Sequence, residues 1–106
     1  MTDTGNSARD RVLAALEDVA RDRGTIAYSE LGRLVGLPTR GPHWKAILED
    51  IALSRPRGAP DLAFLVVSKT TNLPQVDIVR INGKTEEILG RVAREQEACW
   101  DYYQNR

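Results

Sequence analysis

The sequence is poor in the residues from which catalytic and metal sites are usually built. It contains one cysteine, Cys99, and one histidine, His43. A single cysteine cannot form a disulfide within the chain, and the two residues together cannot supply the three or four ligands of a zinc site. We therefore expect no metal and no cofactor. Cys99 falls in a helical pattern, where it is either an inert packed thiol or a reactive one.

The sequence also lacks the patterns of the common enzyme classes. It shows no nucleophile beside a base and no glycine-rich phosphate loop. Asp61 and Lys69 resemble the acid and lysine of a magnesium-dependent nuclease, but Val67 stands where a second acid is needed, and one carboxylate cannot hold the ion. We therefore expect a protein that is not an enzyme.

Long apolar runs and a net charge are missing as well. No run approaches the roughly 20 residues that cross a bilayer, and the first residues lack a basic segment followed by an apolar one. These absences predict a cytoplasmic protein with no membrane partner. Lys and Arg number 15, as do Asp and Glu, so the formal net charge is zero. Binding to nucleic acid through bulk charge is thereby disfavoured, and any anion site must be a local patch.

What is present fits one small domain. A chain of 106 residues is too short for two cores, so we expect a single domain over residues 1–106, with residues 1–6 flexible. Apolar residues recur at helical spacing over residues 8–23, 30–35 and 43–53 and in a last helix that begins at Thr85. Ser7, Ser29 and Thr85 are the expected caps, Gly24 is the expected end of the first helix, and Pro42 suits the first turn of the third.

Three segments read as strands. Residues 25–28 form a brief first strand, and residues 62–67 form a continuous apolar run covered on both faces. After a polar turn over residues 68–74, residues 76–81 form the returning strand of a hairpin, and Asn82 and Gly83 break the chain. The two short helices on either side of the Gly41-Pro42 turn have the local pattern of a helix-turn-helix. The order of elements predicts an α+β fold, a winged helix-turn-helix with four helices, a short first strand and a β-hairpin wing, whose first and last helices pack together behind the sheet.

Residues 24–38, Gly-Thr-Ile-Ala-Tyr-Ser-Glu-Leu-Gly-Arg-Leu-Val-Gly-Leu-Pro, carry a family resemblance. The segment resembles the start of the winged-helix DNA-binding domain of methylated-DNA cysteine methyltransferases and alkyltransferase-like proteins. A looser similarity continues to Val67. The resemblance implies the fold and a helix that faces duplex DNA. It does not imply the repair activity, because the family's Pro-Cys-His-Arg segment is absent and its cysteine position falls at Ala63.

A second segment is similar to a signature of bacterial winged-helix domains. Residues 65–74 read Leu-Val-Val-Ser-Lys-Thr-Thr-Asn-Leu-Pro and match the pattern Leu-Val-Val-x-Lys-x-Thr-x-Leu-Pro. This resemblance implies the fold and names no function.

A duplex-facing helix defines the candidate binding residues. In a helix-turn-helix the start of the second helix enters the major groove, while the preceding residues and the wing hold the backbone. The nucleic-acid-binding residues predicted in this way are Thr39, Arg40, His43, Lys45, Arg57, Lys69, Thr70 and Asn72. The alternative is that these are ordinary solvated surface residues. Trp44 is either a core residue or a stacking platform, and His43 is either a surface or capping residue or a ligand.

The last helix suggests a second hypothesis. Trp100, Tyr102 and Tyr103 crowd its end, where they either cover the first helix or contact a second copy of the chain. Two functions follow: a winged-helix protein that binds duplex DNA, or a module for protein interaction and homodimerisation. The balanced net charge favours the second, whereas charge by segment leaves room for DNA binding of modest affinity, because cations gather from Arg33 to Arg57 while acids gather in the last helix.

Overall fold

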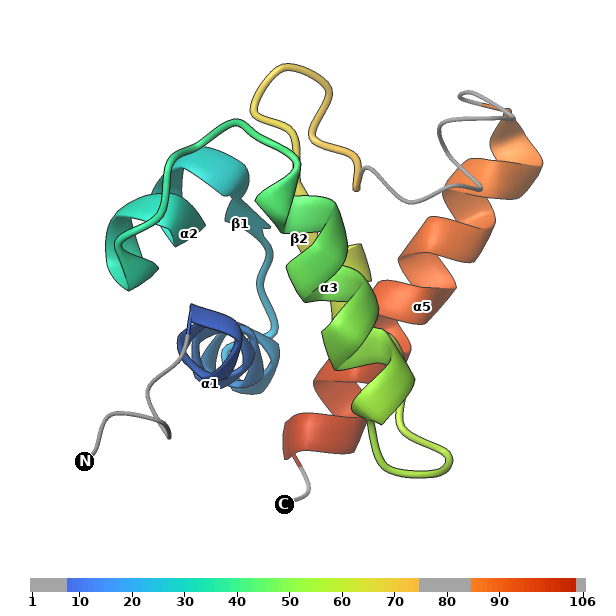
Figure 1. The fold of residues 1–106 in the computed structure, drawn as a ribbon. Helices are drawn as coiled ribbons and strands as arrows, with labels where there is room; N and C mark the ends of the chain where they lie inside the picture. The colour runs from blue at the N-terminus through green and yellow to red at the C-terminus, as the bar shows by residue number, and fades with distance from the viewer. Residues whose placement is uncertain (1–7, 75–84, 105–106) are drawn as a thin grey trace.

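The computed structural model describes residues 8–74 and 85–104. In these ranges the chain forms an α+β domain with four α helices and a two-stranded parallel sheet (Figure 1). The elements are α1 (Ala8–Arg21), β1 (Ile26–Ala27), α2 (Tyr28–Val35), α3 (His43–Ser54), the 3-10 helix η2 (Leu62–Leu65), β2 (Val66–Val67) and α5 (Glu86–Gln104). The expected flexible start over residues 1–6 and the expected strand over residues 76–81 lie outside the described residues.

Helix α1 forms where the apolar spacing predicted it and buries Val12, Leu16 and Ala20. Its end differs in detail from the prediction that Gly24 stops it. The helix ends at Arg21, and Arg23 adopts the left-handed conformation with φ 55°. The amide of Gly24 donates to the carbonyl of Val19 and that of Arg23 to Ala20, which is the Schellman arrangement. An arginine thus occupies the place where glycine is usual.

Helix α2 begins earlier than predicted. It starts at Tyr28, so Ser29 lies inside the helix, and Ala27 stands at the cap position without a side-chain hydrogen bond. Pairing of β1 with β2 holds the backbone extended up to Ala27, so the helix can begin at the next residue. The end is as predicted, because Gly36 has φ 78° and its amide donates to Gly32. A Cβ at Gly32 would lie 2.6 Å from the carbonyl oxygen of Leu37, so only glycine fits this close approach.

Helix α3 follows the predicted pattern. It runs from His43 to Ser54, with Pro42 immediately before it. Trp44, Leu48 and Ile51 are buried, which confirms the predicted apolar face.

Residues 62–67 are not the continuous strand that the sequence predicts. Leu62–Leu65 form the 3-10 helix η2, and only Val66 and Val67 are extended. Two causes can be named. The Asp61 carboxylate accepts a hydrogen bond from the Ala63 amide at 2.9 Å and starts the turn. All four side chains of η2 are buried, and the segment packs against three helices, α1, α3 and α5, whereas a strand has only two faces.

The sheet is short and parallel. Ile26 pairs with Val66, and Ala27 pairs with Val67. After β2 the chain turns through residues 68–73, where the Ser68 amide donates to the Leu73 carbonyl at 2.9 Å, and Pro74 forms an antiparallel bridge with Val67. The turn therefore lies where the sequence places the tip of a hairpin.

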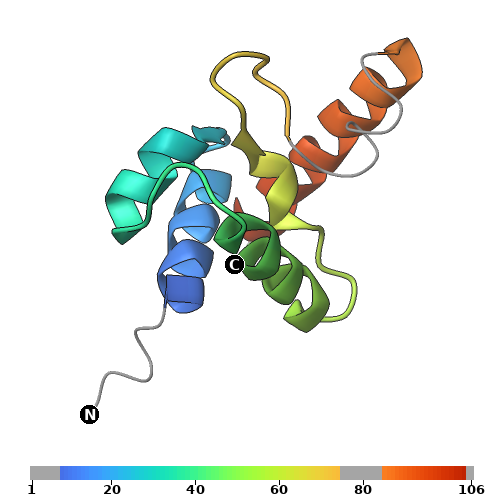
Figure 2. The same ribbon diagram turned by 45° about the horizontal axis from the view of Figure 1, so that its top comes forward.

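Helix α5 closes the core. Thr85 caps it as predicted, because its hydroxyl accepts a hydrogen bond from the Ile88 amide at 3.2 Å. The second half of α5 packs against α1 and η2, in agreement with the predicted contact between the first and last helices. Figure 2 shows α5 passing behind η2. The Gln96 side chain donates to the Phe64 carbonyl at 3.0 Å and ties α5 to η2. None of the helices in the described ranges is long and apolar enough to cross a membrane.

Candidate functional site

A groove of about 950 Å³ opens at the end of the molecule where α3 begins. It lies between the start of α2, the loop that precedes α3, the first half of α3 and the turn after β2. Figure 1 shows this loop and this turn at the same end of the molecule, with the loop that follows α3 at the opposite end. Its apolar lining comes from Tyr28, Trp44, Leu48, Ala52, Ala63 and Phe64.

The groove gathers five of the predicted binding residues. They come from three separate segments: Thr39 and Arg40 from the loop, Lys45 from α3, and Lys69 and Thr70 from the turn. All five are exposed. Lys69 and Thr70 are distant in sequence from Arg40 and Lys45, so only the fold brings them together.

The other three predicted residues do not line the groove. Arg57 lies in the loop beyond the far end of α3, away from Arg40 and Lys45. Asn72 belongs to the turn and has φ 59°, and its amide donates to the Ser68 carbonyl at 2.7 Å. Asparagine tolerates this left-handed conformation better than most residues, so its place is explained by the turn itself.

His43 fastens the loop before α3. Its Nε2 lies 3.0 Å from the carbonyl oxygen of Pro38, and since a carbonyl only accepts, Nε2 carries the proton. The imidazole also tilts against the Trp44 ring at 5.0 Å between centroids. A Cβ on Gly41, which has φ 138°, would lie 2.7 Å from this imidazole. The loop conformation therefore requires glycine at that position.

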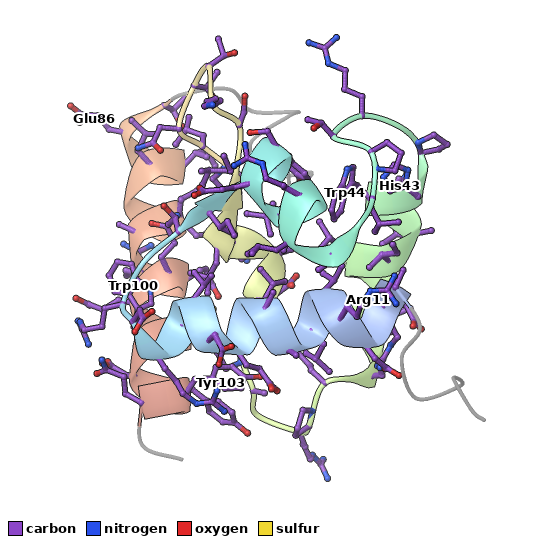
Figure 3. All side chains as sticks on the ribbon, turned by 90° about the vertical axis from the view of Figure 1, so that its left-hand side faces the viewer. Arg11, His43, Trp44, Glu86, Trp100 and Tyr103 are labelled. Carbon is purple, nitrogen blue, oxygen red and sulfur yellow. The ribbon has the colours of Figure 1, made fainter. Side chains whose placement is uncertain are left out.

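Trp44 fixes the same loop, the one that precedes α3, by hydrogen bonds from its buried indole. It is only 5% exposed, which confirms the core interpretation. Its indole Nε1 donates to the carbonyls of Pro38 at 3.0 Å and of Thr39 at 2.9 Å, and its ring meets Tyr28 edge-on at 5.6 Å. Figure 3 shows Trp44 beside His43. These contacts fix the backbone next to Arg40 and leave the indole too enclosed to stack on a base.

Five of the arginines outside the groove are engaged within the molecule. Arg9 bonds Asp50 at 2.7 Å, and Arg21 bonds Asp18 at 3.0 Å. Arg11 donates to the Val35 carbonyl, and Arg55 donates to the carbonyls of Ala59 and Ala52. Arg23 bonds Asp101 and Gln104 and lies over the Trp100 ring at 5.2 Å.

Cations without a side-chain hydrogen bond or ion pair make a different set. In residues 8–74 and 85–104 they are Arg33, Arg40, Lys45, Arg57, Lys69, Arg91 and Arg94. All three cations that line the groove belong to this set. These three cations are therefore available to a ligand.

Two carboxylates also line the groove. Asp61 is occupied, because it caps η2 through the Ala63 amide. Glu49 is exposed and makes no ion pair or hydrogen bond with the residues that the structure describes, whereas the next residue, Asp50, is bonded to Arg9. Neither Glu49 nor the apolar lining of the groove is among the residues predicted from the sequence. The spacing of four residues from Lys45 to Glu49 is the signal that could have placed Glu49 on the same face of α3.

The remaining reactive and aromatic candidates are built into the core. The Cys99 thiol is buried and donates to the Asp61 carbonyl at 3.4 Å. Burial, with the negative charges of Asp61 and Glu95, raises the pKa of this thiol from 9.0 to about 12. At neutral pH it is fully protonated, which is the state of an inert cysteine.

The aromatic end of α5 covers α1. The Trp100 indole donates to the Gly24 carbonyl at 2.9 Å, and Tyr103 is buried beside α1 (Figure 3). Tyr102 is half-buried against the same core and meets Tyr103 edge-on at 4.8 Å between ring centroids. These contacts correspond to the intramolecular alternative of the two that the sequence left open.

In the part of the chain that the structure describes, no three His, Cys, Asp or Glu side chains are grouped so that they could hold a metal ion. Comparisons of the chain with protein-family models, with curated proteins and with solved structures find no match. A function must therefore be inferred from the groove itself.

Proposed function

We propose that this protein is a non-enzymatic winged-helix protein that binds duplex DNA at the groove. One observation carries the proposal: Arg40, Lys45 and Lys69, from three different segments, line one groove and have no hydrogen-bond or ion-pair partner among the described residues. Cations that are held close together and unpaired are suited to a polyanion, because binding releases the counterions of the phosphates.

The order of elements supports a helix-turn-helix arrangement. Helices α2 and α3 are joined by a short loop, and the start of α3 borders the groove of the protein. In helix-turn-helix proteins the start of the second helix enters the major groove of the DNA. The turn at residues 68–73 then takes the role of the wing tip, with Lys69 and Thr70 toward the backbone.

The charge balance supports a modest affinity. The net charge is zero, because acidic residues, several of them in α5, balance the cations, including those of the groove. Binding therefore depends on a few local contacts and not on the charge of the whole molecule. The interaction module predicted from the aromatic end has less support, because Trp100 and Tyr103 are used to pack α5 on α1.

A fluorescence anisotropy titration with labelled duplex DNA at low and moderate salt tests the proposal. Arg40→Ala and Lys45→Ala each remove one unpaired cation, and each is expected to weaken binding several-fold at low salt. Arg21→Ala is the matched control, because it removes one positive charge on α1 away from the groove. Absence of binding by the wild type at low salt, or full retention of affinity by both groove variants, contradicts the proposal.

A further inference from the structure

We infer that Glu49 selects the base sequence by accepting a hydrogen bond from the exocyclic amino group of cytosine in the major groove. This inference rests on the proposed function and deepens it. The observation behind it is an exposed, unpaired carboxylate on the same face of α3 as an unpaired lysine.

The positions of the two residues are fixed by the helix. Lys45 and Glu49 are four residues apart on α3, so they lie one above the other on its surface. Both line the groove, and both are exposed. Although this spacing suits an ion pair, the two side chains do not come within ion-pair distance of each other. Each is therefore available to a ligand.

The neighbouring acids show that Glu49 is the exception. Asp50 points to the other side of α3, where Arg9 holds it at 2.7 Å. Asp61 lies in the groove, but it is used as the cap of η2. Of the carboxylates that line the groove, Glu49 alone has no role in the fold.

A carboxylate on a face that meets DNA is costly unless it finds a donor. Phosphates repel it, and burying it without a partner loses its hydration. The major groove offers two donors, the N4 amino group of cytosine and the N6 amino group of adenine, and a carboxylate is suited to the first. Glu49 therefore opposes binding to most sequences and favours those with cytosine at one position.

Lys45 adds a preference for a second base, at a defined distance along the DNA from the cytosine. Lys45 donates to the O6 and N7 atoms of guanine. Four residues of helix rise about 6 Å, and base pairs rise about 3.4 Å, so the two side chains read positions about two base pairs apart. A G·C-rich site with this spacing is the expected target.

Selection of bound duplexes from a random pool, followed by anisotropy on the enriched sequences, tests this inference. The wild type is expected to enrich cytosine at one position and to lose about tenfold in affinity when that base is changed. Glu49→Gln replaces the carboxylate with an amide, which pairs with adenine, so the preference at that position is expected to move from cytosine to adenine. Glu49→Gln is also expected to bind random duplex more tightly, because the repulsion of the phosphates is removed.

Glu97→Gln serves as the matched control. It removes the same charge from an exposed position of α5 and is expected to leave preference and affinity unchanged. If the wild type enriches no base, or if Glu49→Gln retains the wild-type preference, the inference on Glu49 is wrong while duplex binding stands. If the wild type binds no duplex, the proposed function fails, and the role of Glu49 fails with it.

Discussion

Cys99 shows how strongly the core controls a single side chain. Its thiol is fully enclosed, and burial together with the nearby Asp61 and Glu95 raises its pKa to about 12. The unfolded chain has no such surroundings, so its thiol ionises near the ordinary value of 9.0. The folded and unfolded states thus bind different numbers of protons in alkaline solution.

This difference predicts a loss of stability at high pH. Below pH 9 the thiol is protonated in both states and has no effect on the pH dependence. Between about pH 9 and pH 12 the unfolded state loses the proton first, so the free energy of unfolding falls by up to about 1.4 kcal/mol per pH unit. Urea unfolding at pH 8.5 and pH 10.5 measures this fall in the free energy of unfolding. Cys99→Ser, which has no titrating thiol, is expected to lose less stability over this range, and an equal loss in both proteins would contradict the assignment.

Residues whose role depends on their near neighbours in the sequence, such as helix caps and members of an apolar helix face, could be predicted. The Thr85 cap and the burial of Trp44 followed from spacing and residue type. The separate fates of Glu49 and Asp50 could not be predicted. They are adjacent in sequence, and only the packing of α1 against α3 brings Arg9 to Asp50 and leaves Glu49 in the groove.

Among the elements, the loop between α2 and α3 is held by the helix that follows it. Both hydrogen bonds of the Trp44 indole and that of the His43 imidazole end on the carbonyls of Pro38 and Thr39. The loop that carries Arg40 is therefore ordered before any ligand binds. An ordered loop lowers the entropy cost of binding.

Trp44→Phe is expected to loosen this loop. The variant keeps an aromatic ring in the core but loses the donor to both carbonyls, at a cost of about 1–3 kcal/mol in the free energy of unfolding. Amide hydrogen exchange at residues 39–41 is expected to become faster, and duplex affinity is expected to fall although Arg40 and Lys45 remain. Ile51→Val, a core change of about 1 kcal/mol on the same helix, is the control for stability alone. Unchanged exchange in Trp44→Phe would show that the indole does not order the loop.

The four helices were predictable because each has a periodic apolar face, whereas residues 62–65 were not. Four consecutive apolar residues have no period, so a strand and a buried turn cannot be distinguished from the pattern. Packing decides between them. The segment contacts α1, α3 and α5, and a 3-10 turn presents its side chains to all three helices.

At the scale of the whole molecule, positive charge is divided into two classes. The arginines that join elements are ion-paired with carboxylates or hydrogen-bonded to carbonyl oxygens, and the unpaired cations include the three at the groove. The zero net charge of the sequence conceals this division. The binding residues predicted from the sequence include Arg57 together with Arg40, although the helix predicted over residues 43–53 already separates them, and in the structure they lie beyond opposite ends of α3.

The division predicts a shallow salt dependence of duplex binding. If Arg40 and Lys69 each neutralise one phosphate while Lys45 contacts guanine, the logarithm of the binding constant falls with the logarithm of salt concentration with a slope of about −2. Lys69→Ala is expected to reduce the magnitude of the slope by about one. Arg57→Ala is expected to leave the slope unchanged, because Arg57 belongs to the loop that follows α3, at the end opposite the groove. A reduced slope in Arg57→Ala would extend the interface along the whole helix.

The parallel pairing of β1 with β2 has a consequence for the order of folding. Its two strands stand on either side of α2 and α3 in the chain, so pairing Ile26 with Val66 closes a long loop in exchange for a few backbone hydrogen bonds. The hydrogen bonds between the strands offset the entropy cost of closing that loop only when the helices between them have already shortened the distance between β1 and β2. We therefore expect the helices to assemble first and the β1–β2 pairing to form last, so that the groove, which the turn after β2 borders, is completed late in folding.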